Sequence, residues 1–157
     1  MTTEEKKAFL NSYLAQLRKL KGMQEEYEQL FIARTSVSVS MDGLPRSHNP
    51  TGLEVYAAKR DALARAIAEQ KTTCLDALAD IYYNIEQLTD KDVTKTEEDK
   101  VILTYRYILG LSFDEIGRRL DRTRQHINRL HGRALNRFSV SVQTIPQRGR
   151  QNRITRE

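Results

Sequence analysis

The stretch from Leu111 to Phe138 constrains the fold more than any other part of the chain, because it contains two helix starts separated by a short turn. Ser112 has Glu115 three residues on, which is the capping-box spacing in which each side chain binds a free backbone N–H group. Asp121 tolerates the left-handed backbone of a tight turn, and Thr123 offers a second N-cap. Apolar residues recur at helical spacing after each cap: Phe113, Ile116 and Leu120, then Ile127, Leu130, Ala134 and Phe138. The pattern predicts a helix-turn-helix, and a basic helix in an ordinary bundle is the alternative.

The second helix of this motif carries polar side chains on the face left over by its apolar stripe. Arginine can make a bidentate contact to guanine, and glutamine or asparagine can do so to adenine. Four residues near the start of this helix are therefore candidates for reading base edges: Arg124, Gln125, Asn128 and Arg129. Three residues toward the margins of the same face suit phosphate, which positions a protein without specifying bases: Arg122, Thr123 and Arg133. Arg118 and Arg119, on the polar side of the first helix, are further candidates for phosphate. Double-stranded DNA is the partner that this face predicts.

The charge of the chain is unevenly distributed along its length. Residues 117–157 hold 11 Lys/Arg and 2 Asp/Glu, whereas residues 1–116 carry a net charge of −4. An acidic body with a basic end is expected of a protein that turns one face toward a polyanion. A membrane surface is the less favoured polyanion, because the chain has no Trp and its basic helix needs its apolar stripe for packing.

The composition indicates a protein that stays inside the cell. The N-terminal MTTEEKKAFL lacks the apolar stretch of a signal peptide, and no run approaches the roughly 18 apolar residues of a membrane span. We therefore expect a cytoplasmic protein. Cys74, the single cysteine, sits at helical spacing with Leu78, Ile81 and Ile85, which predicts a buried and unreactive thiol.

Nothing in the sequence indicates an enzyme. His48, His126 and His131 have no metal-ligand spacing with the cysteine or with one another. The chain also has no nucleotide-binding glycine loop, nucleophile elbow or paired-carboxylate arrangement. We expect no catalytic residue, no metal site and no cofactor. Solvation is the expected state of His126 and His131, and a hydrogen bond to phosphate or to a neighbouring residue is the alternative.

Two long helices are predicted before the helix-turn-helix. From about Thr3 to Arg34, apolar residues follow three- and four-residue steps between Leu10 and Phe31, interrupted at Gln24. Residues 35–52 contain several turn formers and predict a loop. A second helix is expected from about Leu53 to Leu88, and the two seams indicate an antiparallel hairpin about 45 to 50 Å long. Because two amphipathic helices alone leave apolar surface exposed, we expect pairing with a second copy, as in a homodimer, or docking on the C-terminal domain.

The fold class is therefore all-α, a long N-terminal helical hairpin followed by a three-helix, helix-turn-helix DNA-binding domain. Residues 1–90 form the hairpin, residues 96–138 the three-helix domain and residues 139–157 a basic tail. Leu88 to Lys95 is a polar connection, after which Thr96 opens a third helix that ends at Gly110. Short Ser/Val runs at 36–40 and 139–142 indicate extended linkers, and strand pairing between them is the alternative.

One segment of the chain resembles a known family. Region 4 of bacterial sigma factors is similar to the segment LTYRYILGLSFDEIGRRLDRTRQHINRLHGRALNRF, and phage transcription regulators of the RinA and ArpU type, which share this region, are more similar still. Related small phage proteins have a midsection similar to MDGLPRSHNPTG. Gly117 stands where that family usually has Ala, and Asp121 stands where Gly is common. The resemblance implies a regulator that switches on late genes in phages of Gram-positive bacteria.

Four functions are compatible with these observations. The first is a dimeric, sequence-specific DNA-binding transcriptional regulator, which in a phage would be a late-gene activator in the host bacterial cell. The second is a sigma-like module that binds host RNA polymerase through the surface of Val101 to Leu111. The third is a terminase small subunit that recognises a packaging site, and the fourth is a phage-encoded inhibitor of a host protein. We expect the first, because the basic helix carries hydrogen-bonding groups suited to base edges.

Overall fold

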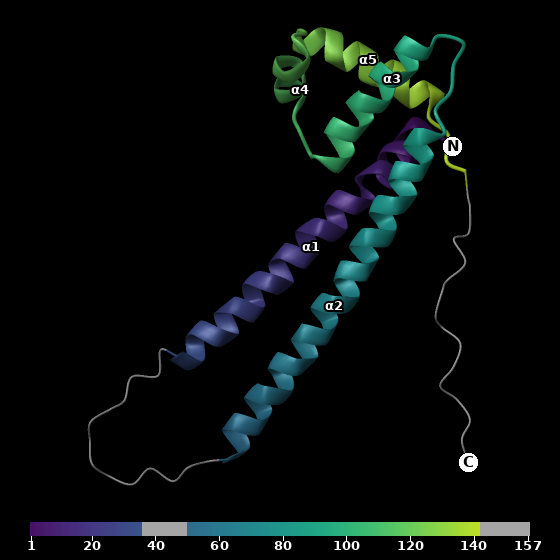
Figure 1. Ribbon diagram of the computed structural model, residues 1–157. Coiled ribbons are helices and arrows are strands. Elements are labelled where there is room, and N and C mark those ends of the chain that lie inside the picture. The colour runs from purple at the N-terminus through teal and green to yellow at the C-terminus, as the bar shows by residue number, and fades with distance from the viewer. Residues whose placement is uncertain (36–49, 142–157) are drawn as a thin grey trace, which may run out of the picture.

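The computed structural model describes residues 1–35 and 50–141, and nearly all of them are helical. The helices are α1 (Thr3–Thr35), α2 (Pro50–Glu86), α3 (Val93–Leu103), α4 (Phe113–Leu120) and α5 (Arg124–Arg137), and a π-helical turn, η1 (Thr104–Ile108), extends α3. Figure 1 shows a long hairpin of α1 and α2, with α3, α4 and α5 gathered at the end where α1 begins and α2 ends. The prediction of an all-helical chain with an N-terminal hairpin is confirmed.

The two hairpin helices begin at local sequence signals. Thr2 and Glu5 form a reciprocal cap for α1, in which the Glu5 amide donates to Thr2 Oγ1 over 3.3 Å and the Thr2 amide donates to Glu5 Oε2 over 2.7 Å. Helix α2 begins at Pro50, a residue suited to the first turn because it has no N–H group to leave unpaired. The helix therefore starts three residues before the predicted Leu53 and ends at Glu86 rather than Leu88.

The predicted apolar seams pack against each other within one chain. Leu10 and Leu20 of α1 and Cys74 of α2 are buried, as the spacing of the cysteine predicts. Gln70 is buried among them, and its Nε2 donates to Oε1 of Gln16 over 2.8 Å. A single polar pair in an apolar seam favours one register of the two helices, because any other register would leave the amide unpaired.

The C-terminal helices dock on the base of the hairpin, so the chain has a shared core. Leu10, Ile81, Ile85 and Leu88 from the hairpin end lie in one buried cluster with Leu103, Tyr107, Ala134, Leu135 and Phe138. The expected docking of the hairpin on the C-terminal domain is therefore confirmed at this end of the hairpin. The hairpin and the three-helix unit are thus separate segments of sequence that complete one apolar interior.

Helix α3 begins earlier than the sequence predicted. Asp92 is its N-cap and accepts a hydrogen bond from the Lys95 amide over 3.3 Å, so the helix starts at Val93 and not at Thr96. Thr96 is buried within the helix and donates from its hydroxyl to the Asp92 carbonyl over 3.0 Å. The prediction that this helix opens at Thr96 was wrong, because aspartate is the stronger N-cap and stands four residues ahead. Gly110 does follow the end of η1, with φ +70° in the left-handed region.

The segment after α5 runs beside the base of α2. Val140 packs against the shared core, and the Ser141 amide donates to Oδ1 of Asn84 over 2.7 Å. The described part of the second Ser/Val run, residues 139–141, is not a strand, and the first run at 36–40 lies outside the described residues. None of the helices in the described ranges combines the length and the apolar character needed to cross a bilayer.

Candidate nucleic-acid interface

The first helix of the motif, α4, is fixed at its start by the predicted capping box. The Glu115 amide donates to Ser112 Oγ over 3.3 Å, and the Ser112 amide donates to Glu115 Oε2 over 2.7 Å. The Ser112 hydroxyl also donates to this carboxylate over 2.6 Å. These hydrogen bonds from Ser112 lower the pKa of the Glu115 carboxyl. The position of Glu115 at the start of α4 is therefore explained by capping.

The turn between α4 and α5 is closed by backbone contacts to Gly117. Asp121 has φ 52°, the left-handed conformation expected for it, and its amide donates to the Gly117 carbonyl. The Arg122 amide donates to the same carbonyl over 2.9 Å. A methyl group added at Gly117 would lie 2.6 Å from the Arg122 carbonyl oxygen, so this turn requires glycine where the resembling family usually has Ala.

The second helix, α5, is capped by Thr123 and presents one face of its first two turns to solvent. Thr123 accepts a hydrogen bond from the His126 amide over 3.3 Å, as its N-cap position predicts. Ile127, Leu130 and Ala134 are buried on the opposite face, which confirms the predicted apolar stripe. This buried stripe therefore packs α5 against the rest of the domain, while the polar side chains of its first turns remain accessible.

The four candidate base-reading residues lie together on this accessible face. Arg124, Gln125, Asn128 and Arg129 are all exposed. Arg124, Gln125 and Asn128 line a shallow hollow of about 400 Å³ with Phe113. Arg124 also lies 3.5 Å from Asp114, but both side chains are more than half exposed, so the ion pair contributes little and leaves the guanidinium available.

The candidate phosphate-binding arginines of α4 and the turn flank the same face. Arg118, Arg119 and Arg122 are exposed, and Arg119 lies over the ring of Tyr105 at 5.6 Å from its centroid. Arg118, Arg122 and Arg124 line a second hollow of about 490 Å³ together with Thr123. The cations thus border the start of α5, where the free N–H groups of a helix also favour an anion.

Arg133 is a correction to the predicted set. Its guanidinium donates to Asp99 over 2.6 and 2.9 Å and to Glu98 over 2.9 Å, so its hydrogen-bonding groups face the interior of the three-helix unit. A guanidinium that is hydrogen-bonded to two carboxylates inside the protein has few donors left for phosphate. We therefore remove Arg133 from the candidate DNA contacts.

His131 is a second correction, because it is buried rather than solvated, and of the stated alternatives it makes the hydrogen bond to a neighbouring residue. The ring is buried, its Nε2 lies 2.9 Å from the hydroxyl of Tyr107, and its centroid lies 5.0 Å from that of Phe113. Burial lowers the pKa of His131 to about 4 and raises that of Tyr107 to about 12, so both rings are neutral at pH 7. His131 stands four residues after Ile127 on the buried stripe, and that spacing was the signal available in the sequence.

No group of three His, Cys, Asp or Glu side chains that could hold a metal occurs among the residues that the structure describes. The geometry instead defines a helix-turn-helix domain: two capped helices, a left-handed residue in the turn between them and an exposed polar face on the second helix.

Comparison with known families assigns this domain more closely. Residues 96–139 match the family model for Sigma-70, region 4, which confirms that part of the resemblance and gives the chain a DNA-binding regulatory domain. The match covers a little over a quarter of the chain. Searches of curated proteins and of solved structures found nothing that matches.

Proposed function

We propose that this protein is a sequence-specific transcriptional regulator that reads the major groove with the first two turns of α5. The observation that carries the proposal is the exposed cluster of Arg124, Gln125, Asn128 and Arg129 on one face of a supported helix. These side chains combine charge with bidentate hydrogen-bonding groups, and such groups distinguish one base pair from another. Charge alone would bind any duplex equally.

Phosphate contacts from the flanking arginines would set the register of α5 on the duplex. Arg118, Arg119 and Arg122 are exposed beside the base-reading face and differ from Arg133 in having no internal carboxylate partner among the described contacts. Contacts of this kind position a protein on the backbone without specifying a sequence.

Within this class we propose a late-gene activator of a phage, acting as a homodimer in the cytoplasm of the host bacterial cell. The similarity of the Leu103 to Phe138 segment to phage late regulators supports this choice, and host RNA polymerase is a further candidate partner. The apolar seams that suggested dimerisation are used between α1 and α2 of one chain. A dimer would therefore use a different surface of the hairpin.

The base-reading role is tested by the variant in which Arg124, Gln125 and Asn128 are all changed to Ala. Each lost base contact costs about 1 to 3 kcal/mol, so we expect at least about a 100-fold loss of preference for operator over scrambled duplex. A matched control removes the same three residue types from exposed positions elsewhere, as Arg18→Ala, Gln87→Ala and Asn11→Ala. Equal losses on both duplexes would reassign the three residues to phosphate.

The operator and the regulatory role are tested by genome-wide footprinting of the bound protein. A late-gene activator should protect DNA upstream of late promoters, and two inverted half-sites would indicate two copies. Protection at a packaging start would instead identify a terminase small subunit. Absence of any preferred site would overturn the proposal in favour of a module directed at a protein.

A further inference from the structure

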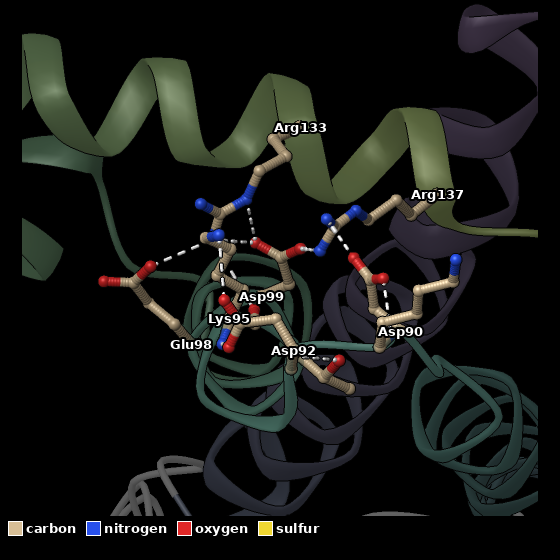
Figure 2. A network of polar contacts seen from close by, with 9 residues as sticks. Asp90, Asp92, Lys95, Glu98, Asp99, Arg133 and Arg137 are labelled. Carbon is tan, nitrogen blue, oxygen red and sulfur yellow. Dashed lines mark hydrogen bonds and ion pairs between the residues drawn. The ribbon is translucent and has the colours of Figure 1, made fainter.

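The second half of α5 is held by charged groups from the segments around it. Figure 2 shows the carboxylate of Asp99 between the guanidinium groups of Arg133 and Arg137, with Glu98 beside the first and Asp90 beside the second. We call these five residues the Asp99 cluster. They bring together α5, α3 and the connection that leads from α2 to α3.

Asp99 is the central residue of the cluster and is only 1% exposed. Its Oδ1 accepts hydrogen bonds from Nε and Nη2 of Arg133 over 2.9 and 2.6 Å, and its Oδ2 accepts one from Nη1 of Arg137 over 3.0 Å. The hydrogen bond to Asp99 raises the pKa of Arg133 further above its usual range. One buried carboxylate therefore fixes two arginines that stand one helical turn apart.

The end of α5 is also tied to the first turns of α1. Nζ of Lys6 donates to the carbonyl oxygens of Leu135 and Asn136 over 2.8 and 3.3 Å. These carbonyls belong to the last turn of α5, where a cation also complements the helix dipole. Charged contacts thus join this half of α5 to α1, to α3 and to the α2–α3 connection.

The apolar core and the Asp99 cluster make different contributions at this place. Ala134, Leu135 and Phe138 pack against the hairpin base, but burial of apolar surface has no directional preference. Hydrogen bonds between arginine and carboxylate have a fixed planar geometry. The core therefore attaches α5 to the hairpin, and the cluster adds directional contacts that restrict the rotation and tilt of the helix.

We infer that Asp99 is a positioning residue for DNA reading, which orients the exposed half of α5 through Arg133 and Arg137 without touching DNA. The inference rests on the proposed function. With 14 residues, α5 is about 21 Å long. A change of about 10° in the tilt of α5 about its C-terminal end would displace its N-terminal end by about 4 Å, which exceeds the length of a hydrogen bond. Base contacts need placement within about 0.5 Å.

The orientation is tested by distances between spin labels in the full-length protein. Labels on Asn128→Cys of α5 and Glu69→Cys of α2 report how α5 lies on the hairpin, in a chain whose buried Cys74 is changed to Ala. We expect one narrow distance distribution for the parent, and a distribution broadened or shifted by several ångströms in Asp99→Asn. The control is Glu97→Gln, which removes an exposed carboxylate of α3 that lies outside the Asp99 cluster and pairs with Lys100.

Binding is measured on unlabelled variants of the same kind. We expect Asp99→Asn to lose at least tenfold in preference for operator over scrambled duplex, and Glu97→Gln to retain it. Because loss of a buried carboxylate can prevent folding, Asp90→Asn supplies a milder change at the more exposed edge of the cluster. Leu17→Ala in the hairpin controls for lost stability alone and should leave both readouts unchanged in the folded protein.

Folded Asp99→Asn or Asp90→Asn protein with an unchanged distance distribution would overturn the inference. A changed distribution with full operator preference would overturn it as well, because the orientation would then not matter for reading. If the parent protein shows no operator preference, the proposed function fails, whereas the distance distributions still decide whether the cluster orients α5.

Discussion

Replacing Gly117 by alanine places a methyl group against the backbone of the turn between α4 and α5. The added carbon would lie 2.6 Å from the carbonyl oxygen of Arg122, 3.6 Å from its carbonyl carbon and 3.7 Å from the amide nitrogen of Arg124. All three are backbone atoms, so no flexible side chain can move aside. The turn would have to retreat by roughly 0.6 Å to reach a tight but tolerable contact, and Thr123 would move with it.

The net cost combines two opposing effects. Overpacking of this kind typically costs about 1 to 3 kcal/mol, whereas alanine in place of glycine inside a helix gains about 0.5 to 1 kcal/mol. We expect Gly117→Ala to destabilise the protein by about 1 to 2 kcal/mol, which lowers the Tm by about 2 to 8 °C in a chain of this size. Thermal unfolding followed by circular dichroism measures the change.

Gly132 offers a matched control in the neighbouring helix. It lies within α5, and a methyl group added there would meet nothing within 4 Å. The same substitution should therefore raise the Tm, because only the helix-propensity gain remains. A Gly117→Ala variant as stable as Gly132→Ala would refute the tight packing of the turn against α4. DNA binding adds a second readout, since displacement of Thr123 also displaces the start of α5.

Two further predictions concern solution conditions. Burial holds the pKa of His131 at about 4, against about 6.5 for an unperturbed histidine. Between about pH 4 and 6.5, His131 is therefore protonated in the unfolded chain and neutral in the folded chain. The free energy of unfolding should therefore fall, by at most about 3 kcal/mol, as the pH drops from about 6.5 to about 4. The Tm of His131→Gln, measured over the same pH range, should lack the part of the decrease that His131 causes. Neutralisation of three phosphates by Arg118, Arg119 and Arg122 would give a slope of about −2.7 per copy for the logarithm of affinity against that of salt, or about a 40-fold loss from 50 to 200 mM. Truncation after Val142 removes four arginines outside the described residues, and a binding isotherm with an unchanged slope would assign the phosphate contacts to the three-helix domain.

The parts of this fold that the sequence predicts are those determined by neighbours in the chain. A capping box needs two residues three apart, so Ser112 and Glu115 identify the start of α4 without any tertiary information. The left-handed turn at Asp121 and the cap at Thr123 are local in the same sense. The exposed polar face of α5, for which we propose base reading, is found by removing the residues of the apolar stripe, since periodicity divides a helix into two faces.

The two corrections to the predicted site, Arg133 and His131, involve residues whose partners are distant in sequence. Arg133 looks like a free basic residue until Asp99, 34 residues earlier, is placed beside it. A partial signal existed, because Asp99 lies three residues before the buried Ile102 on α3, and a carboxylate on a buried face requires a cation. The partner of Lys6 could not be predicted in this way, since backbone carbonyls of the last turn of a helix leave no signature in side-chain composition.

The shared core has a consequence for the order in which the protein is made. Leu10 is fully buried against Phe138, Leu135 and Ile81, so its partners are synthesised up to 128 residues after it. At about 5 to 20 residues per second, translation from Leu10 to Phe138 takes roughly 6 to 26 s, and the packing of Leu10 cannot be completed before then. A growing chain can form the hairpin first, but the helix-turn-helix cannot reach its final support until the end of α5 has emerged. The DNA-binding domain is therefore not an independent folding unit. If the chain were cut between α2 and α3 and the fragments separated, each would expose its half of the shared apolar core.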